Sequence, residues 1–307
     1  MKRTSCIILL SCIVSLVAMG FLKVPGSDRF DRWQGGGLYA GGMAYWPGHD
    51  SLIVSSPVSG RGDLWEIDRN GQWAQPLMET AESEIDPHAS RSDMLYFARF
   101  VGGRYCIFSR NMATQAEILE VELYEHAIQP VPLPSGDAFL FVRCANFILG
   151  NDAEIWEKSL KSGELRRLAI GGSVSCFGDS QKILFCKRVG DDIGVYEMSL
   201  KNQSSEFICL GSDAVLSDDE KTVFMVRRRT PSYDWDVWSR ELASGVERAY
   251  PFGKGTVQST CQVRGGRVAA VFWDVADNAG IPAILDPSTG EWKVLPRLLK
   301  LTEFGKE

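Results

Sequence analysis

Side chains that could carry out acid–base or metal chemistry are few and scattered in this sequence, which contains three histidines. Asp86 and His88 are two residues apart and His126 follows later, so a fold that brings all three together would provide acid–base or metal-binding groups. The sequence has no Gly-x-Ser-x-Gly elbow, no His-x-x-x-His pair and no Cys-x-x-Cys pair. The sequence therefore predicts no catalytic residue, no metal site and no cofactor, and enzymatic activity is the less favoured hypothesis.

Basic residues recur at a spacing of roughly forty residues. If the chain folds into a ring of repeats, these residues would lie near one rim and form a positive collar for a carboxylate, a phosphate or an acidic peptide. The alternative is that each one pairs with an acidic residue of its own or a neighbouring repeat, such as Asp191 or Asp192. The recurring residues are Arg99, Arg143, Lys187 with Arg188, and Arg227 in the run 227–229.

Six cysteines lie beyond the first 22 residues, and their spacing fits no metal site. Cys176 and Cys186 flank an expected turn at residues 178–180, so they could face each other and form a disulfide outside the cytoplasm. The alternative, which we favour, is that all six are small buried residues of strands.

The chain begins with Lys2-Arg3 and an apolar run over residues 6–22, followed by a polar break. The triplet Ala18-Met19-Gly20 resembles a cleavage site, so this segment is expected to be a secretory signal peptide or, if uncleaved, a single membrane anchor. Both alternatives place the remaining chain outside the cytoplasm. The net charge of −6 argues against nucleic acid as a partner.

A short apolar strand with a central aromatic residue recurs along the chain. The aromatic residues lie 43, 48, 40 and 42 positions apart, within or near the period of β-propeller blades. A second apolar strand and a turn rich in Gly, Ser and Asp precede each one, and a further turn and strand follow. Four strands per unit, six times, predict an all-β six-bladed propeller with the aromatics packed between units. The aromatics are Trp65, Phe108, Trp156, Tyr196 and Trp238, and a sixth copy at 282–285 lacks one.

One unit shows the repeat well. Residues 134–141 combine a Ser-Gly-Asp turn with an apolar strand, and Glu154-Ile155-Trp156 follows as the apolar–aromatic strand. This order resembles the TolB-like, WD-like β-propeller repeat family over about residues 40 to 297. The resemblance implies an extracytoplasmic six-bladed propeller that binds proteins or small ligands.

These observations predict a signal peptide or anchor over residues 1–22, a linker over 23–40, a propeller over 41–297 and a short tail over 298–307. The favoured function is a non-catalytic binding or scaffolding propeller, periplasmic or secreted, that takes a protein or small anionic ligand at its channel mouth. The alternative is a lyase or hydrolase with its site at the channel. The candidate binding residues are Asp86, His88, His126, Arg99, Arg143, Arg188 and Arg227.

Overall fold

The computed structural model describes residues 42–56, 62–90, 92–145, 153–176, 181–228, 235–253, 256–263, 265–274 and 279–295. The expected signal peptide or anchor, the linker and the C-terminal tail lie outside these residues. No helix capable of crossing a membrane occurs within the described ranges.

Six antiparallel sheets of four strands each make up the described chain. Every sheet consists of four strands that are consecutive in sequence, so no described strand is borrowed from another blade to close the ring. We call the sheets blades 1 to 6. Blade 1 consists of β1 Met43–Trp46, β2 Ser51–Ser56, β3 Asp63–Asp68 and β4 Ala74–Met78; blade 2 of β5 Glu84–Ala89, β6 Met94–Val101, β7 Arg104–Asn111 and β8 Glu117–Val121; and blade 3 of β9 His126–Pro132, β10 Ala138–Cys144, β11 Glu154–Ser159 and β12 Leu165–Ile170. Blade 4 consists of β13 Gly172–Cys176, β14 Lys182–Val189, β15 Asp192–Ser199 and β16 Ser205–Leu210; blade 5 of β17 Ser212–Leu216, β18 Thr222–Arg228, β19 Trp235–Glu241 and β20 Glu247–Tyr250; and blade 6 of β21 Thr256–Val263, β22 Arg267–Asp274, β23 Ala279–Asp286 and β24 Glu291–Val294.

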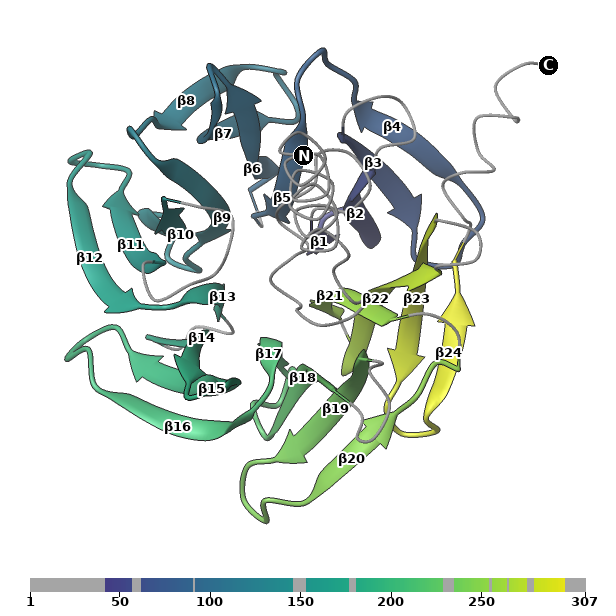
Figure 1. The fold of residues 1–307 in the computed structure, drawn as a ribbon. Coiled ribbons are helices and arrows are strands. Elements are labelled where there is room, and N and C mark those ends of the chain that lie inside the picture. Colours follow the sequence, from purple (N-terminus) through teal and green to yellow (C-terminus); the bar gives the residue numbers. More distant parts are fainter. Residues whose placement is uncertain are drawn as a thin grey trace, which may run out of the picture.

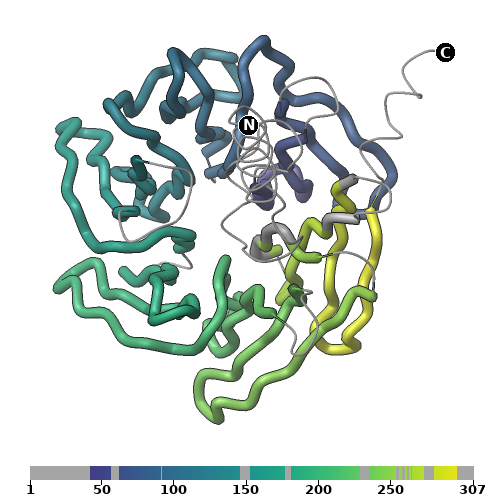
Figure 2. Tube along the Cα trace, in the orientation of Figure 1, coloured from purple at the N-terminus to yellow at the C-terminus, as the bar shows by residue number. Residues whose placement is uncertain are grey.

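The blades form a ring around a central channel, and the expected six-bladed propeller is confirmed (Figure 1). The first strand of each blade faces the centre, and the fourth lies at the circumference. The chain passes once around the ring, so that blade 6 returns to the side of blade 1 (Figure 2). Apolar side chains of these two blades, including Val54 and Val271, share one buried cluster that closes the ring.

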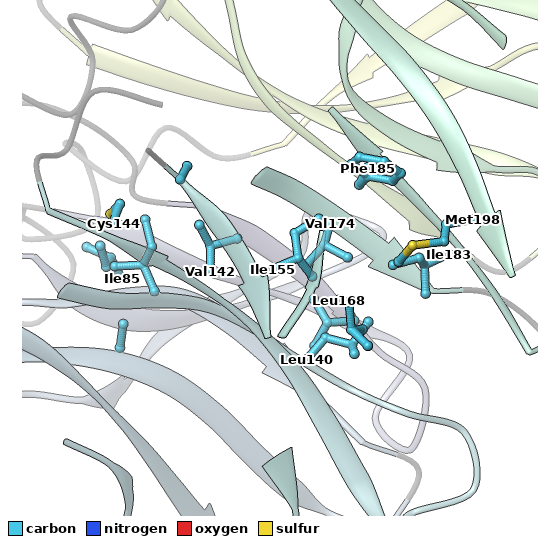
Figure 3. Close-up of a cluster of buried hydrophobic side chains, with 14 residues drawn as sticks. Ile85, Leu140, Val142, Cys144, Ile155, Leu168, Val174, Ile183, Phe185 and Met198 are labelled. Atoms are coloured by element: carbon cyan, nitrogen blue, oxygen red, sulfur yellow. The ribbon is translucent and has the colours of Figure 1, made fainter. Parts of the chain in front are cut away.

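Packing between neighbouring blades explains why the unit repeats. A four-stranded sheet has two apolar faces, and each face is buried only by the neighbouring blade on that side. Figure 3 shows one such cluster, in which Leu140 and Val142 of β10 approach Val174 and Ile183 of blade 4. The recurring aromatics pack in these clusters as expected: Phe108 lies against blade 1 and Trp156 against blade 2.

Candidate functional site

A cavity of about 490 Å³ occupies the mouth of the central channel, on the side of the turns that join the first and second strands. We call it the mouth cavity. Serine, threonine and apolar side chains line it, and none of its described lining residues is Asp, Glu, Lys or Arg. The lining residues with a polar side chain are Tyr45, His88, Ser90, Ser92, Ser135, Ser175, Cys176 and Thr260.

A ring of bulges lies just below this cavity. In blades 2 to 5 the register of the first strand shifts at one residue, and that residue has a positive φ near 50°. A bulge interrupts the regular ladder of its sheet, so the polar groups of the bulge residue can reach the next blade. The four bulge residues are Asp86, Gln129, Ser173 and Asp213.

Hydrogen bonds pass along this ring from blade to blade. The Gln129 N–H donates to Asp86 Oδ2 (3.1 Å), and the Ser173 N–H donates to Gln129 Oε1 (2.8 Å). The Ser173 hydroxyl donates to Asp213 Oδ1, and Thr260 Oγ1 donates to the Asp213 carbonyl (2.5 Å). The ring therefore fastens the inner strands of blades 2 to 6 to one another.

Asp86 ends this ring on the side of blade 1, where the corresponding position is Gly42. Gly42 has a φ of +94°, and a Cβ there would lie only 2.7 Å from Asp86 Oδ1, so a side chain at this position is excluded. The Asp86 residue is 8% exposed, and burial raises the pKa of its carboxyl to about 8. Asp86 is therefore protonated over much of the neutral range, and acts as a structural member of the ring.

His88 and His126 lie at different levels of the channel. His88 lines the mouth cavity two residues after the bulge at Asp86, whereas His126 begins β9, three residues before the bulge at Gln129. Because a strand rises about 3.3 Å per residue, this offset of five residues places the backbones of the two histidines about 15 Å apart along the channel. The Tyr105 N–H donates to His126 Nδ1 (3.1 Å), and burial lowers the pKa of His126 and lowers that of His88 to about 4. The structure does not bring the two histidines together.

The recurring basic residues share one position in their blades. Each follows the second strand's buried stretch and lies over the aromatic ring of the third strand, which explains why the two features recur together. The distances from cation to ring centroid are 4.9 Å for Arg99 over Phe108, 5.6 Å for Arg143 over Trp156, 5.8 Å for Lys187 over Tyr196 and 5.2 Å for Arg227 over Trp238.

Glutamates neutralise three of these arginines. Arg99 contacts Glu84 (2.7 Å) and Glu117 (2.5 Å) and is only 12% exposed. Arg143 pairs with Glu125 and Glu154, and Arg227 pairs with Glu247. The partners are glutamates of the same blade or of the segment just before it, rather than Asp191 or Asp192. Arg188 differs, since it is exposed and donates to the Gly190 carbonyl (3.0 Å).

The possible disulfide between Cys176 and Cys186 does not form. Cys176 lies opposite Ile183, whereas Cys186 lies opposite Gly172 at the other end of the hairpin, and both thiols are free. The interpretation that they face each other is wrong because the register places Cys186 three residues beyond the position opposite Cys176. Burial raises the pKa of each thiol to about 12, in keeping with the alternative of small buried residues.

Sequence reasoning missed one ordered histidine. His49 Nδ1 lies 3.1 Å from Glu66 Oε1, and its ring stacks on Trp46 with centroids 3.6 Å apart. Glu66 is buried and also accepts from Ser51 (2.6 Å) and Gln75 (3.1 Å). Nothing in the spacing of His49 and Glu66 signals their contact, because it depends on the pairing of β2 with β3. His49 does not line the mouth cavity.

Comparison with solved structures places this architecture among known propellers. TolB from Acinetobacter baumannii superposes with a TM-score of 0.67 at 18% identity, over 77% of this chain and 60% of that one. A putative TolB from Agrobacterium tumefaciens gives 0.61 at 13% identity, over 73% and 84% of the two chains. The chain has the fold of a TolB-like six-bladed β-propeller.

The same fold also occurs in enzymes. An oligogalacturonate lyase in complex with manganese superposes with a TM-score of 0.57 at 13% identity, over 84% of this chain and 77% of the lyase. No protein-family model and no curated protein matches the sequence. The chain spans three-fifths of the length of the Acinetobacter TolB, and fold alone does not transfer the activity of any of these proteins.

Proposed function

We propose that this chain is a non-catalytic binding propeller that works outside the cytoplasm and receives its partner at the mouth cavity. The cavity carries the proposal: it is large enough for a side chain or small ligand, and it offers hydroxyls and apolar surface. The apolar start of the sequence and the fold shared with TolB support the location.

The described lining residues carry no Asp, Glu, Lys or Arg, which favours a protein segment or a neutral ligand over an anionic one. Three of the four arginines expected to bind an anion are already paired with glutamates, and none of the four lines the cavity. An anion in the cavity would lose its hydration without gaining a cationic partner. Arg188 remains a candidate for contacts outside the cavity.

The alternative of a lyase or hydrolase at the channel receives less support from the geometry. A general acid–base mechanism needs a titrating group within hydrogen-bond reach of the reacting atom, commonly with a second group that orients it. His88 is the one histidine that lines the cavity, and its low pKa leaves it neutral and weakly basic. Asp86 belongs to the ring of bulges below.

Blocking the cavity tests the proposal. Cys176 lines the mouth cavity, so the indole of Cys176→Trp would reduce the space in the cavity. Val246→Trp, at a 64% exposed position on an outer turn, is the matched control. The full-length protein is used for affinity capture from envelope extract and for melting measurements across a metabolite panel.

We expect a captured protein, or a ligand that raises the melting temperature, with the wild type and Val246→Trp but not with Cys176→Trp. Equal capture or equal melting shifts for all three would contradict binding at the mouth. The melting curve of Cys176→Trp without ligand checks that the variant folds.

A further inference from the structure

A second cavity, of about 460 Å³, runs between blades 2 and 3 on the same side of the ring. We call it the blade 2–3 groove. Ile118 of β8 and Leu160, which follows β11, form its outer end, and Tyr96 of β6 and Ala138 of β10 lie along its length. It therefore leads from the centre of the ring to the outermost strand of blade 2.

The groove and the mouth cavity adjoin each other. They share five lining residues, all in or beside the turns that join the first and second strands of blades 2 and 3. Four strands spaced about 4.8 Å apart give the groove a length of about 14 Å, which accommodates about four residues of an extended peptide. A single extended chain could thus lie in the groove and end in the mouth. The shared residues are Ser90, Ser92, Pro132, Leu133 and Gly136.

The described lining of the groove consists of apolar residues together with two serines, a tyrosine and one glutamate. Ile118 is 56% exposed and Leu160 is 36% exposed, so both would lose contact with water under a ligand. Among the described lining residues Glu120 alone is acidic or basic, and its carboxylate already contacts Lys158 Nζ (2.8 Å) and accepts from Ser109 (2.7 Å). Apolar side chains of a ligand would therefore meet no unpaired charge from these residues.

Acidic residues flank the inner end of the groove. Asp93 follows Ser92 in the turn of blade 2, and Asp137 follows Gly136 in the turn of blade 3, and both are exposed. A lysine or arginine of the ligand placed between them would be attracted from either side. Among the described residues, this charge distribution complements a basic residue at the inner end of the groove.

We propose that the blade 2–3 groove and the mouth cavity together bind one extended segment of a protein partner, whose apolar side chains fill the groove and whose lysine or arginine lies near Asp93 and Asp137. This proposal rests on the proposed binding function, because it extends the mouth cavity into a peptide site.

Ile118 and its neighbour Leu119 provide a matched pair of variants. The two residues are adjacent on β8 and similarly exposed, but Leu119 does not line the groove. A phage-displayed library of random dodecapeptides is panned against the full-length protein, and synthetic fluorescent copies of the enriched peptides are titrated against the variants. Melting curves confirm that each variant is folded.

We expect enriched peptides that combine several apolar residues with a lysine or arginine. Ile118→Asp and Leu160→Asp should weaken binding at least tenfold, whereas Leu119→Asp should stay within twofold of the wild type. The groove is overturned if no peptide is enriched, or if Ile118→Asp and Leu160→Asp bind within twofold of the wild type. If Cys176→Trp alone abolishes binding, the groove is overturned while binding at the mouth stands.

Discussion

Replacing Asp86 by asparagine tests the ring of bulges through the pH dependence of stability. Asparagine keeps an oxygen that can accept from the Gln129 N–H but cannot ionise. Burial raises the pKa of Asp86 to about 8, whereas in the unfolded chain it has its ordinary value of about 3.9. The wild type and Asp86→Asn should therefore differ most in how their stability responds to pH.

The direction of the pH dependence follows from the number of protons bound by the folded and the unfolded protein. Between about pH 4 and pH 8 the folded wild type keeps a proton that the unfolded chain has released, so its free energy of unfolding falls as the pH rises. Each pH unit in this window costs about 1.4 kcal/mol, which gives about 4 kcal/mol between pH 5 and pH 8. Asp86→Asn lacks this loss, so its stability relative to the wild type should rise by about this amount between pH 5 and pH 8.

Urea unfolding of both proteins at pH 5, 6, 7 and 8 measures this difference. Other titrating groups, such as Glu84 and His126, are present in both proteins and cancel when the two free energies are subtracted. If the difference between wild type and Asp86→Asn stays constant from pH 5 to pH 8, the carboxyl is not held protonated by the ring, and the reasoning is wrong.

Three further predictions concern the arginines, the thiols and one glycine. Arg99→Leu should lower the free energy of urea unfolding by about 3 to 5 kcal/mol, because it leaves the buried carboxylate of Glu84 without its positive partner. Arg188→Ala, at an exposed position, should change this free energy by less than about 0.5 kcal/mol, and equal effects of the two substitutions would contradict a structural role for Arg99. Mapped alkylation at pH 8 should leave Cys186 and Cys209 unmodified until the protein is unfolded, since burial raises the pKa of both thiols to about 12, and rapid labelling of the folded protein would refute this. Gly171→Ala should lower the thermal midpoint by several degrees, because its Cβ would lie 2.5 Å from a backbone oxygen at a φ of +146°, and an unchanged midpoint would show that the strand can shift to make room.

The blade architecture was predictable because it repeats. The spacing of Trp65, Phe108, Trp156, Tyr196 and Trp238 reflects a physical need, which is that each sheet buries its faces against its neighbours. Each copy of the repeat meets the same packing requirement, so the repeat could be recognised even though the sixth copy lacks the aromatic residue. The topology of the ring then follows from antiparallel strands in sequence order.

The ring of bulges was not predictable in the same way. Asp86 was a candidate binding residue, but the hydrogen bonds of Asp86 and Gln129 to neighbouring blades depend on a one-residue register shift. Pro87 and Pro130 directly follow them, and since proline within sheets is confined to edges and bulges, these two residues were the available signal.

The arginines show why a recurring charge is weak evidence for a ligand. Their spacing was recognised correctly, but their pairing with glutamates depends on side-chain reach across strands, which spacing alone does not give. The mouth cavity and the blade 2–3 groove could also not be predicted from the sequence, because turns from different blades form both of them.

Site-specific photo-crosslinking in intact cells tests the central claim most directly. A photoreactive amino acid replaces Ser135, which is exposed and lines the mouth cavity, or Val246, which lies on an outer turn. We predict a discrete covalent adduct from position 135 that disappears when Cys176→Trp is added, and no such adduct from position 246. The absence of an adduct at position 135, or one that persists with the cavity blocked, would contradict binding at the mouth of the propeller.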